Sequence, residues 1–369
     1  MTQRPCAAPI LVAGTAFIPA AEPTRQRAKA LKPRGLNKWR MLDLLRPISP
    51  PRTQACRRRR ISPTVQVQQM GDGSRRVSGV LSCGSVWGCP VCSQRICSHR
   101  ADELQSVIKE WRGEVSMVTL TVRHGLGQSL KKIRKGVANA WRKVWQGKRA
   151  KLLRELFHVK HSIRALEVTH GENGWHPHLH VLVLGNTAPE PAALEYLREL
   201  WIAAVESELG EENAPDWSHG VVLSTGGGGS YLAKMGLEVT HHHTKAARRS
   251  SRTPWEIALD AIEGDEASAA LWREYVSAMK GARQLTWSRG TRRFFGLGLR
   301  DSDAAIVEDA PPDPAAGFLL ADWDGPVWDA LVRSDPFWVS RLATAESFEL
   351  EGLPGWARSV RVEDSPPPD

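Results

Sequence analysis

Residues 165–184 read ALEVTHGENGWHPHLHVLVL, and this stretch decides the fold of the chain. Two segments rich in apolar and β-branched residues, 162–170 and 176–184, flank the polar loop 171–174. Two strand-like runs joined by a short loop that contains glycine are typical of a β-hairpin. The sequence therefore predicts two adjacent antiparallel strands here.

The register of this hairpin predicts three polar side chains on one face. With a loop at these positions the numbers of paired residues sum to 345, so Glu167 is expected opposite His178, at a Cβ distance of about 5 Å. His178 and His180 alternate with Leu179 and therefore leave the strand on the same side. Two imidazoles and a carboxylate suit a divalent metal with open positions, which can polarise a phosphodiester oxygen. The alternative is a solvated polar strand face that happens to carry histidines.

The composition indicates a folded protein with a basic body. The chain has 369 residues, a net charge of +10 and 41% hydrophobic residues, enough for a core. No apolar run approaches the 18 to 20 residues of a membrane span. Residues 9–21 resemble a weak secretory signal, but the cysteine pattern favours a reducing compartment, so we expect a cytoplasmic protein. A basic body favours nucleic acid as partner, and the alternative is a surface kept basic for solubility.

Charge and composition divide the chain into four expected parts. Residues 1–60 carry 14 Lys and Arg against 2 acidic residues and predict a basic flexible arm. A cysteine-rich module over 61–110 precedes a domain over 111–300 that contains the hairpin. Residues 301–369 carry 4 Arg against 15 acidic residues and predict an acidic, Pro-rich C-terminal region. Because strands and helices are intermixed, we expect an α+β fold with an antiparallel sheet flanked by helices.

Four of the six cysteines are clustered within 15 residues, and they predict a zinc site. Two of them form a Cys-x-x-Cys turn, which suits tetrahedral Zn²⁺, and the chain is too long for so few cysteines to act as a disulfide scaffold. A redox pair and simple free thiols are the alternatives. The clustered residues are Cys83, Cys89, Cys92 and Cys97, and the fourth ligand stays open among Cys97, His99 and Cys56.

Several motifs occur in one order along residues 80–300. They are HPHLH at 176–180, TLTVRH at 119–124, YLAK at 231–234, WREY at 272–275 and LTWS at 285–288. Together they resemble the HUH endonucleases, and more specifically the rolling-circle plasmid replication initiators of Gram-positive and actinobacterial type. The resemblance implies an HUH-type antiparallel sheet preceded by a small zinc-binding module.

The resemblance also implies an enzyme that cuts one DNA strand with a tyrosine and leaves a 5′-phosphotyrosine and a free 3′-hydroxyl. Tyr231 is the expected nucleophile, with Lys234 one helical turn later, whereas Tyr196 and Tyr275 are expected to serve packing. Some members of the family carry a glutamate four residues before the tyrosine, where this chain has Gly227. Glu238 is a candidate substitute for it, so the chemistry that ends replication stays open.

The implied cofactors are Mg²⁺ or Mn²⁺ on Glu167, His178 and His180 and a structural Zn²⁺ on the cysteines. The implied partners are plasmid origin DNA, duplex and single-stranded, a host helicase and a host DNA polymerase. The alternatives are an HUH relaxase or transposase with the same chemistry and a non-catalytic zinc-dependent regulator; a zinc protease would need a helical HExxH motif, which the chain lacks. The expected DNA contacts are Arg57, Arg58, Arg59, Arg60, Arg123 and His124.

Overall fold

A computed structural model describes residues 36–71, 75–225, 251–298, 301–308 and 317–344. The chain divides into two compact units, residues 1–37 and 38–369, and every described helix and strand belongs to the second unit. No helix of the described ranges is long and apolar enough to cross a membrane.

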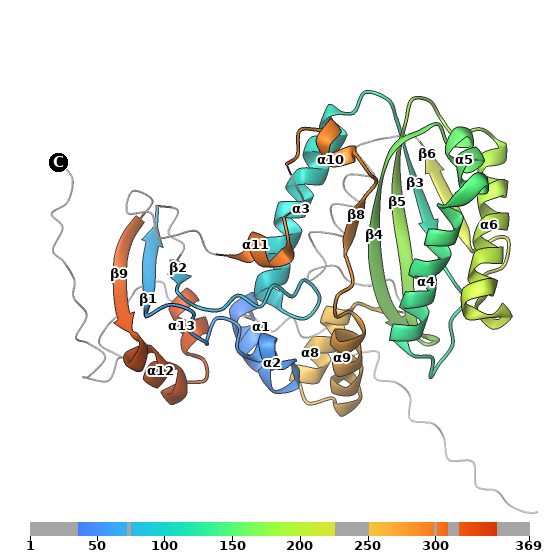
Figure 1. The fold of residues 1–369 in the computed structure, drawn as a ribbon. Coiled ribbons are helices and arrows are strands. Elements are labelled where there is room, and N and C mark those ends of the chain that lie inside the picture. Colours follow the sequence, from blue (N-terminus) through green and yellow to red (C-terminus); the bar gives the residue numbers. More distant parts are fainter. Residues whose placement is uncertain (1–35, 72–74, 226–250, 299–300, 309–316, 345–369) are drawn as a thin grey trace, which may run out of the picture. The chain divides into compact units, whose positions relative to one another are not determined.

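The largest element of the second unit is a six-stranded antiparallel sheet (Figure 1). Its strands follow the order β6-β3-β5-β4-β7, and β8 also pairs with β4. The α+β class with antiparallel sheets flanked by helices is thereby confirmed. The strands are β3 (Glu114–Leu120), β4 (Val159–Gly171), β5 (Gly174–Gly185), β6 (Val221–Thr225), β7 (Ser251–Arg252) and β8 (Leu285–Trp287).

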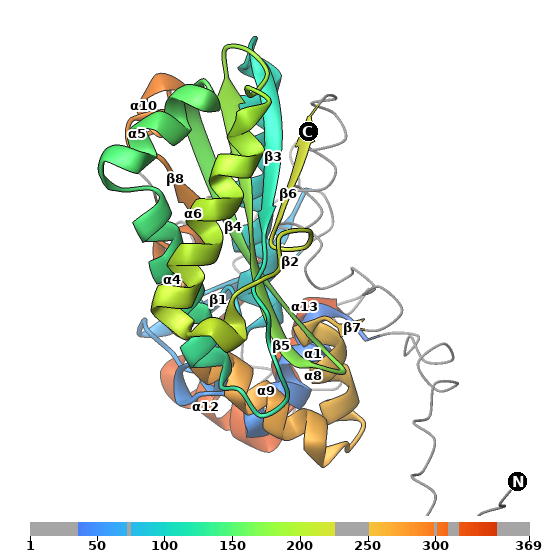
Figure 2. The same ribbon diagram turned by 90° about the vertical axis from the view of Figure 1, so that its right-hand side faces the viewer.

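Three helices cover one face of this sheet (Figure 2). In α4, apolar residues recur at the spacing of a single helix face, including Leu130, Ile133 and Val137, and they are buried. Ile133 and Val137 join one core with Leu179 and Val181 of β5. The helices are α4 (Leu130–Val144), α5 (Gly147–Leu156) and α6 (Ala192–Leu209), and the short 3₁₀ helix η3 (Glu211–Asn213) follows α6.

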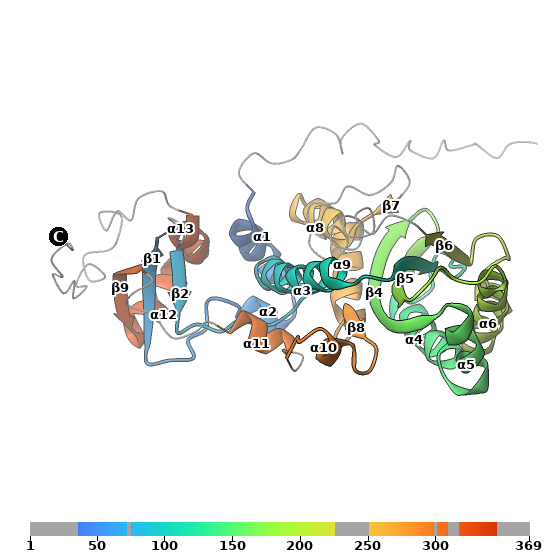
Figure 3. The same cartoon turned by 90° about the horizontal axis from the view of Figure 1, so that it is seen from above.

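The other face of the sheet packs against helix α3 (Pro90–Glu110), as the view in Figure 3 shows. Leu104 and Val107 of this helix form a core with Met117 of β3 and Leu182 of β5. The side chain of Cys89 accepts a hydrogen bond from the backbone N–H of residue 92, and a proline stands at the first helical position. The helix therefore begins directly at the Cys-x-x-Cys turn.

A separate three-stranded sheet joins the two ends of the described chain. Its order is β2-β1-β9, and both pairings are antiparallel. Val65 and Val67 of β1 share a core with Trp323 and Trp328, which follow more than 250 residues later in the sequence. The elements are β1 (Thr64–Met70), β2 (Arg75–Ser78), β9 (Gly317–Asp324), α12 (Gly325–Ser334) and α13 (Trp338–Thr344).

Residues 38–60 are folded, so the flexible arm expected over residues 1–60 does not extend to residue 60. Residues 317–344 are also folded, within the stretch expected as an acidic C-terminal region, and they supply β9, α12 and α13. Apolar residues such as Leu42 and Leu45 are buried despite the high charge around them. The remaining elements are α1 (Lys38–Leu45), η2 (Arg46–Ile48), α2 (Pro51–Gln54), α8 (Pro254–Ile262), α9 (Glu266–Ala278), α10 (Thr291–Phe294) and α11 (Asp303–Val307).

Candidate metal centres and catalytic site

Strands β4 and β5 bring the three expected metal ligands together. Glu167 pairs directly with His178 in the register in which residue numbers sum to 345. Its Oε2 lies 2.9 Å from Nε2 of His178 and 3.0 Å from Nε2 of His180. The ligand atoms of the three residues all lie within 4.8 Å of one another, and Glu167 and His180 are buried. The hairpin thus forms a compact carboxylate–imidazole group on one face of the sheet.

The second nitrogen of each imidazole has a partner of its own. Nδ1 of His178 lies 3.2 Å from the backbone carbonyl of His176, and Nδ1 of His180 lies 3.1 Å from Oγ1 of Thr119 on β3. A carbonyl only accepts, so Nδ1 of His178 donates, and in the neutral imidazole Nε2 keeps its lone pair. That lone pair faces the Glu167 carboxylate, which is also an acceptor.

This arrangement passes a test of fit for a divalent metal. Two acceptor atoms that face each other repel unless a proton or a cation lies between them. Metal-bound histidines usually donate their other N–H to a carbonyl or a carboxylate, as His178 does here. Two imidazole nitrogens and one carboxylate oxygen are a donor set that leaves coordination positions open for substrate.

Two further histidines extend the group along the sheet. The rings of His124 and His176 are stacked, with centroids 4.4 Å apart and planes at 11°. The ring of His176 lies 5.0 Å from that of His178. Burial, with His178 and His124 as further causes, lowers the pKa of His176 to about 3, and burial also lowers the pKa of His124. Both imidazoles are therefore neutral at neutral pH and keep positive charge away from the ligands.

The position of His176 could have been read from the sequence. It alternates with His178 and His180 and so belongs to the same strand face. Thr119 gave a weaker signal, because its contact with His180 depends on the pairing of β3 with β5. The TLTVRH motif begins at the end of β3, which pairs directly with the histidine strand β5.

The expected nucleophile lies outside the described residues. This holds for Tyr231, Lys234 and Glu238. Tyr275 is fully buried and stacks against Trp175, and burial raises its pKa well above the ordinary value. The Tyr196 ring packs against the core under α6. The structure therefore agrees with packing roles for these two tyrosines.

Four cysteines form a second group of possible metal ligands, and the fourth member is Cys56. The sulfur of Cys92 lies 3.7 Å from those of Cys56 and Cys83, and the sulfurs of Cys89 and Cys56 are 3.8 Å apart. A tetrahedral zinc with Zn–S bonds of 2.3 Å requires S···S distances of about 3.8 Å. All four thiols are buried. The cluster therefore has the dimensions that structural zinc requires.

The surroundings of these sulfurs also suit a metal. Backbone N–H groups of Cys83 and Ser85 donate to the sulfurs of Cys56 and Cys83, at 3.4 and 3.5 Å. Such donors stabilise thiolates and orient them toward a metal. Hydrogen bonding from Cys56, and then from Cys83 and Cys89, lowers the pKa of the Cys92 thiol.

Cys97 belongs to a different environment, which corrects the expected set of ligands. Its sulfur lies 3.6 Å from Oε1 of Gln284 and 3.8 Å from Oγ of Ser93. Cys97 follows Cys92 by five residues on α3, and five residues turn a helix by about 500°, which leaves the two side chains about 140° apart. His99 faces Glu103 on the same helix instead.

Three of the four arginines in the run at 57–60 contact other parts of the fold. Arg57 is buried and donates to a backbone carbonyl of β2, and Arg58 donates to a carbonyl of α12. Arg60 forms an ion pair with Asp329 at 3.0 Å. Arg59 is exposed. Outside this run, the side chain of Arg123 is also exposed, next to the stacked histidine at 124.

The comparisons with known proteins agree with this arrangement. Residues 74–197 match the family model described as "Replication protein". The matched residues include the carboxylate–histidine group and Cys83, Cys89 and Cys92 of the four-cysteine group.

Two curated proteins are similar to the chain. "Protein rep" from Streptomyces lividans is 29% identical and aligns with 73% of this chain and 76% of its own length. "Neomycin resistance protein" from Streptomyces cyanogenus is 31% identical over 30% of this chain and 32% of its own length. No solved structure matches the chain significantly.

Proposed function

We propose that this protein initiates rolling-circle replication of a plasmid by nicking one strand of the origin. The observation that carries the proposal is the group of Glu167, His178 and His180, whose donor atoms converge on one face of the sheet. The family match over residues 74–197 and the similarity to "Protein rep" support the same reading.

Glu167, His178 and His180 would hold Mg²⁺ or Mn²⁺. When bound, such an ion polarises a non-bridging oxygen of the scissile phosphate and lowers the barrier to attack at phosphorus. The protein itself orients the ligands: the carbonyl of His176 and the hydroxyl of Thr119 fix the two rings. The neutral imidazoles of His124 and His176 line the approach without adding charge.

Tyr231 is the proposed nucleophile. Its phenolic oxygen would attack the phosphorus, the bond from phosphorus to the 3′ oxygen would break, and the 3′ oxygen would take a proton to become the primer hydroxyl. A free tyrosine has a pKa of about 10, so the attack requires electrostatic assistance. Lys234 would provide a cation near the phenol or the phosphate, and Glu238 is a candidate base for the closing step.

The chain length permits Tyr231 to reach the metal group. Thr225 ends β6 and pairs with Ser116 of β3, and His180 pairs with Thr119 of the same strand. Three residues along the sheet and two strand spacings separate Thr225 from His180 by about 14 Å. Tyr231 follows Thr225 by six residues, which can span up to about 20 Å.

The buried four-cysteine cluster would hold a structural Zn²⁺ and fix the start of α3. We propose that origin DNA contacts the exposed Arg59 and Arg123 together with His124. Arg57, Arg58 and Arg60 would contribute by holding the fold. A host polymerase would extend the 3′-hydroxyl, a host helicase would unwind the duplex, and the protein would act in the cytoplasm.

The test is the covalent adduct between protein and DNA. We expect the full-length protein, with Mn²⁺ and an origin hairpin oligonucleotide labelled on the 3′ side of the nick, to become labelled itself. Tyr231→Phe should abolish the adduct and leave origin binding intact, whereas Tyr196→Phe should form it normally. An adduct that persists in Tyr231→Phe would overturn the nucleophile assignment. The absence of any adduct or nicking with the unaltered chain would favour a non-catalytic regulator.

A further inference from the structure

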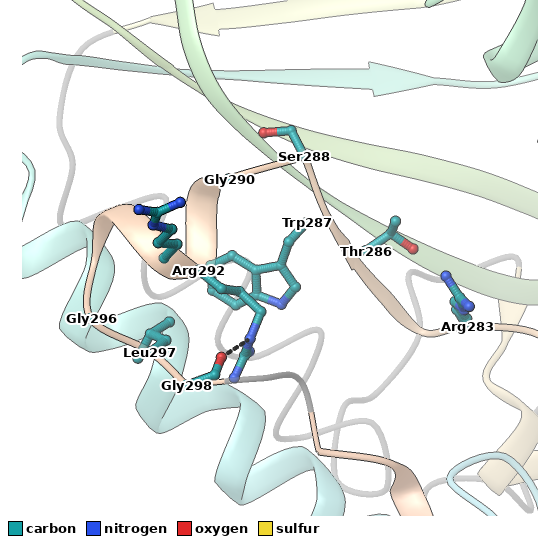
Figure 4. A pocket seen from close by; sticks show the side chains of 10 residues that line it. Arg283, Thr286, Trp287, Ser288, Gly290, Arg292, Gly296, Leu297 and Gly298 are labelled. Atoms are coloured by element: carbon teal, nitrogen blue, oxygen red, sulfur yellow. Dashed lines mark hydrogen bonds between the residues drawn. The ribbon is translucent and has the colours of Figure 1, made fainter.

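A cavity of about 610 Å³ lies at the edge of the large sheet, along β8 and the turn that leads into α10 (Figure 4). In that view the side chain of Arg292 lies next to the indole of Trp287, and Arg283 lies further along the chain toward the start of β8. Among the described residues that line the cavity none is acidic. Its polar side chains are those of Arg283, Arg292, Arg293, Thr286 and Ser288.

The indole of Trp287 is held in place by the core beneath the sheet face and by the neighbouring Arg292. Trp287 is half-buried and packs on the core shared with α3, so part of the ring is fixed and part lines the cavity. The guanidinium of Arg292 lies 5.5 Å from the ring centroid. Arg292 is itself fixed by an ion pair with Glu103 at 2.6 Å and by a hydrogen bond to the carbonyl of Gly298.

Two other cations of the cavity point into solvent. The side chains of Arg283 and Arg293 are exposed. Arg283 is close enough to Arg164 to lower the pKa of that guanidinium, although burial is the larger cause. Positive charge therefore accumulates beside an aromatic face, and this combination suits a ligand that has both a planar ring and an anionic group.

The cavity lies along β8, which pairs with the strand that carries Glu167. Trp287 pairs with Ile163 of β4, and Glu167 follows Ile163 by four residues on the same strand face. Four residues of a β-strand span about 13 Å. A stacked DNA strand rises about 3.4 Å per nucleotide. About four nucleotides would therefore separate a base in the cavity from the phosphate at Glu167.

We propose that this cavity binds one nucleotide of the single-stranded DNA that leads to the metal group, with the base stacked on Trp287 and its phosphates on Arg283 and Arg293. The inference rests on the proposed function and adds to it a binding subsite remote from the scissile phosphate. Base stacking on an aromatic side chain tolerates any sequence, so the subsite would hold the strand without selecting its bases.

Photo-crosslinking tests the location directly. The full-length protein is mixed with a 12-nucleotide oligo-dT that carries one 5-iodouracil, in EDTA, irradiated and digested for mass spectrometry. We expect a crosslinked peptide that contains Trp287. Crosslinks that fall only outside residues 283–298 would overturn the proposal.

Charge removal tests the same subsite by affinity. We expect the double variant Arg283→Ala, Arg293→Ala to bind the oligo-dT about tenfold more weakly and to lower the slope of log K against log salt by about 1.4, at about 0.7 per phosphate contact. The matched double variant Lys148→Ala, Arg149→Ala removes two exposed charges on α5 and should leave both values unchanged. Equal effects of the two variants would contradict a site at Arg283 and Arg293.

The ring is tested with two variants because it also packs on the core. Trp287→Ala should weaken oligo-dT binding about tenfold, and Trp287→Phe should weaken it less while circular dichroism stays unchanged. Competition separates free nucleotide from strand: dTMP that displaces oligo-dT at equal concentration would overturn the assignment to DNA. These measurements use EDTA and no cleavage, so they can fail while the Tyr231 adduct forms, and the adduct can fail while they succeed.

Discussion

At the scale of single residues, the proposed metal site depends most on Glu167, because one of its oxygens faces Nε2 of both histidines. We expect Glu167→Gln to lose Mn²⁺ affinity and to lower nicking of supercoiled origin plasmid about 100-fold or more, since the charged ligand is removed without a change of shape. Titration calorimetry with Mn²⁺ and a plasmid relaxation assay measure the two effects.

The matched control for this variant is Glu172→Gln, in the exposed turn of the same hairpin. It removes the same charge from the same hairpin and should retain both metal binding and nicking. If both variants nick at the rate of the unaltered protein, the carboxylate–histidine group is not the catalytic centre.

The fourth ligand of the cysteine cluster is the second prediction at this scale. We expect Cys56→Ser to lower the bound zinc from about one per chain to well below one, whereas Cys97→Ser should keep it, because its sulfur faces Gln284. Metal analysis of the purified variants decides between them. Zinc loss in Cys97→Ser with retention in Cys56→Ser would reverse the assignment.

The sequence predicts the carboxylate–histidine group more completely than the four-cysteine group. Glu167 and His178 could be paired by counting, because a hairpin with a known loop fixes its register. The choice between Cys56 and Cys97 could not be made by counting. Cys56 precedes the other three by at least 27 residues, and its approach to Cys83 depends on how the chain folds between them.

At the scale of elements, the hairpin also explains why a small error in the loop had no consequence. The sequence suggests a loop over 171–174, whereas Gly171 pairs with Gly174 in the structure and the turn has two residues. Because the extra pair extends the ladder symmetrically, the sum of 345 and the face of each side chain are unchanged. The pairing of β7 and β8 with β4 left no comparable signal, since both strands are two or three residues long.

Glu274 links α9 to the histidine strand β5 and to the start of α4. Its two carboxylate oxygens accept from Nε1 of Trp175 at 2.8 Å and from the backbone N–H of Leu130 at 3.0 Å. We expect Glu274→Ala to destabilise the protein by about 2–4 kcal/mol, because two largely buried donors lose their acceptor. Glu274→Gln, which keeps one oxygen, should cost about half as much.

Urea unfolding followed by circular dichroism measures this difference, and Glu263→Ala at the exposed end of α8 serves as the control. A cost below about 0.5 kcal/mol for Glu274→Ala would mean that the linkage does not contribute to stability.

At the scale of the whole molecule, the described chain is closed by the pairing of β1, near its beginning, with β9, near its end. The charge gradient suggests a separate acidic region after residue 300, but Trp323 of β9 and Trp328 of α12 share a core with Val65 and Val67 of β1. Composition cannot reveal this closure, because it depends on pairing between segments about 250 residues apart. Some of the opposite charges of residues 1–60 and 301–369 form ion pairs with each other, such as that of Arg60 with Asp329.

Two truncations test which part of the C-terminal region is needed for the stability of the fold. Deletion of 301–369 removes α11, β9, α12 and α13, and β1 loses a partner strand and both tryptophans. We therefore expect residues 64–78 to become sensitive to protease and the melting temperature to fall by several degrees. Deletion of 345–369 removes none of the described elements and should leave both properties unchanged. If the longer deletion melts like the full chain, the β1–β9 pairing does not hold the fold together. If the shorter deletion alone gains affinity for random DNA, the acidic residues after 344 oppose non-specific binding, because the fold of that variant would be intact.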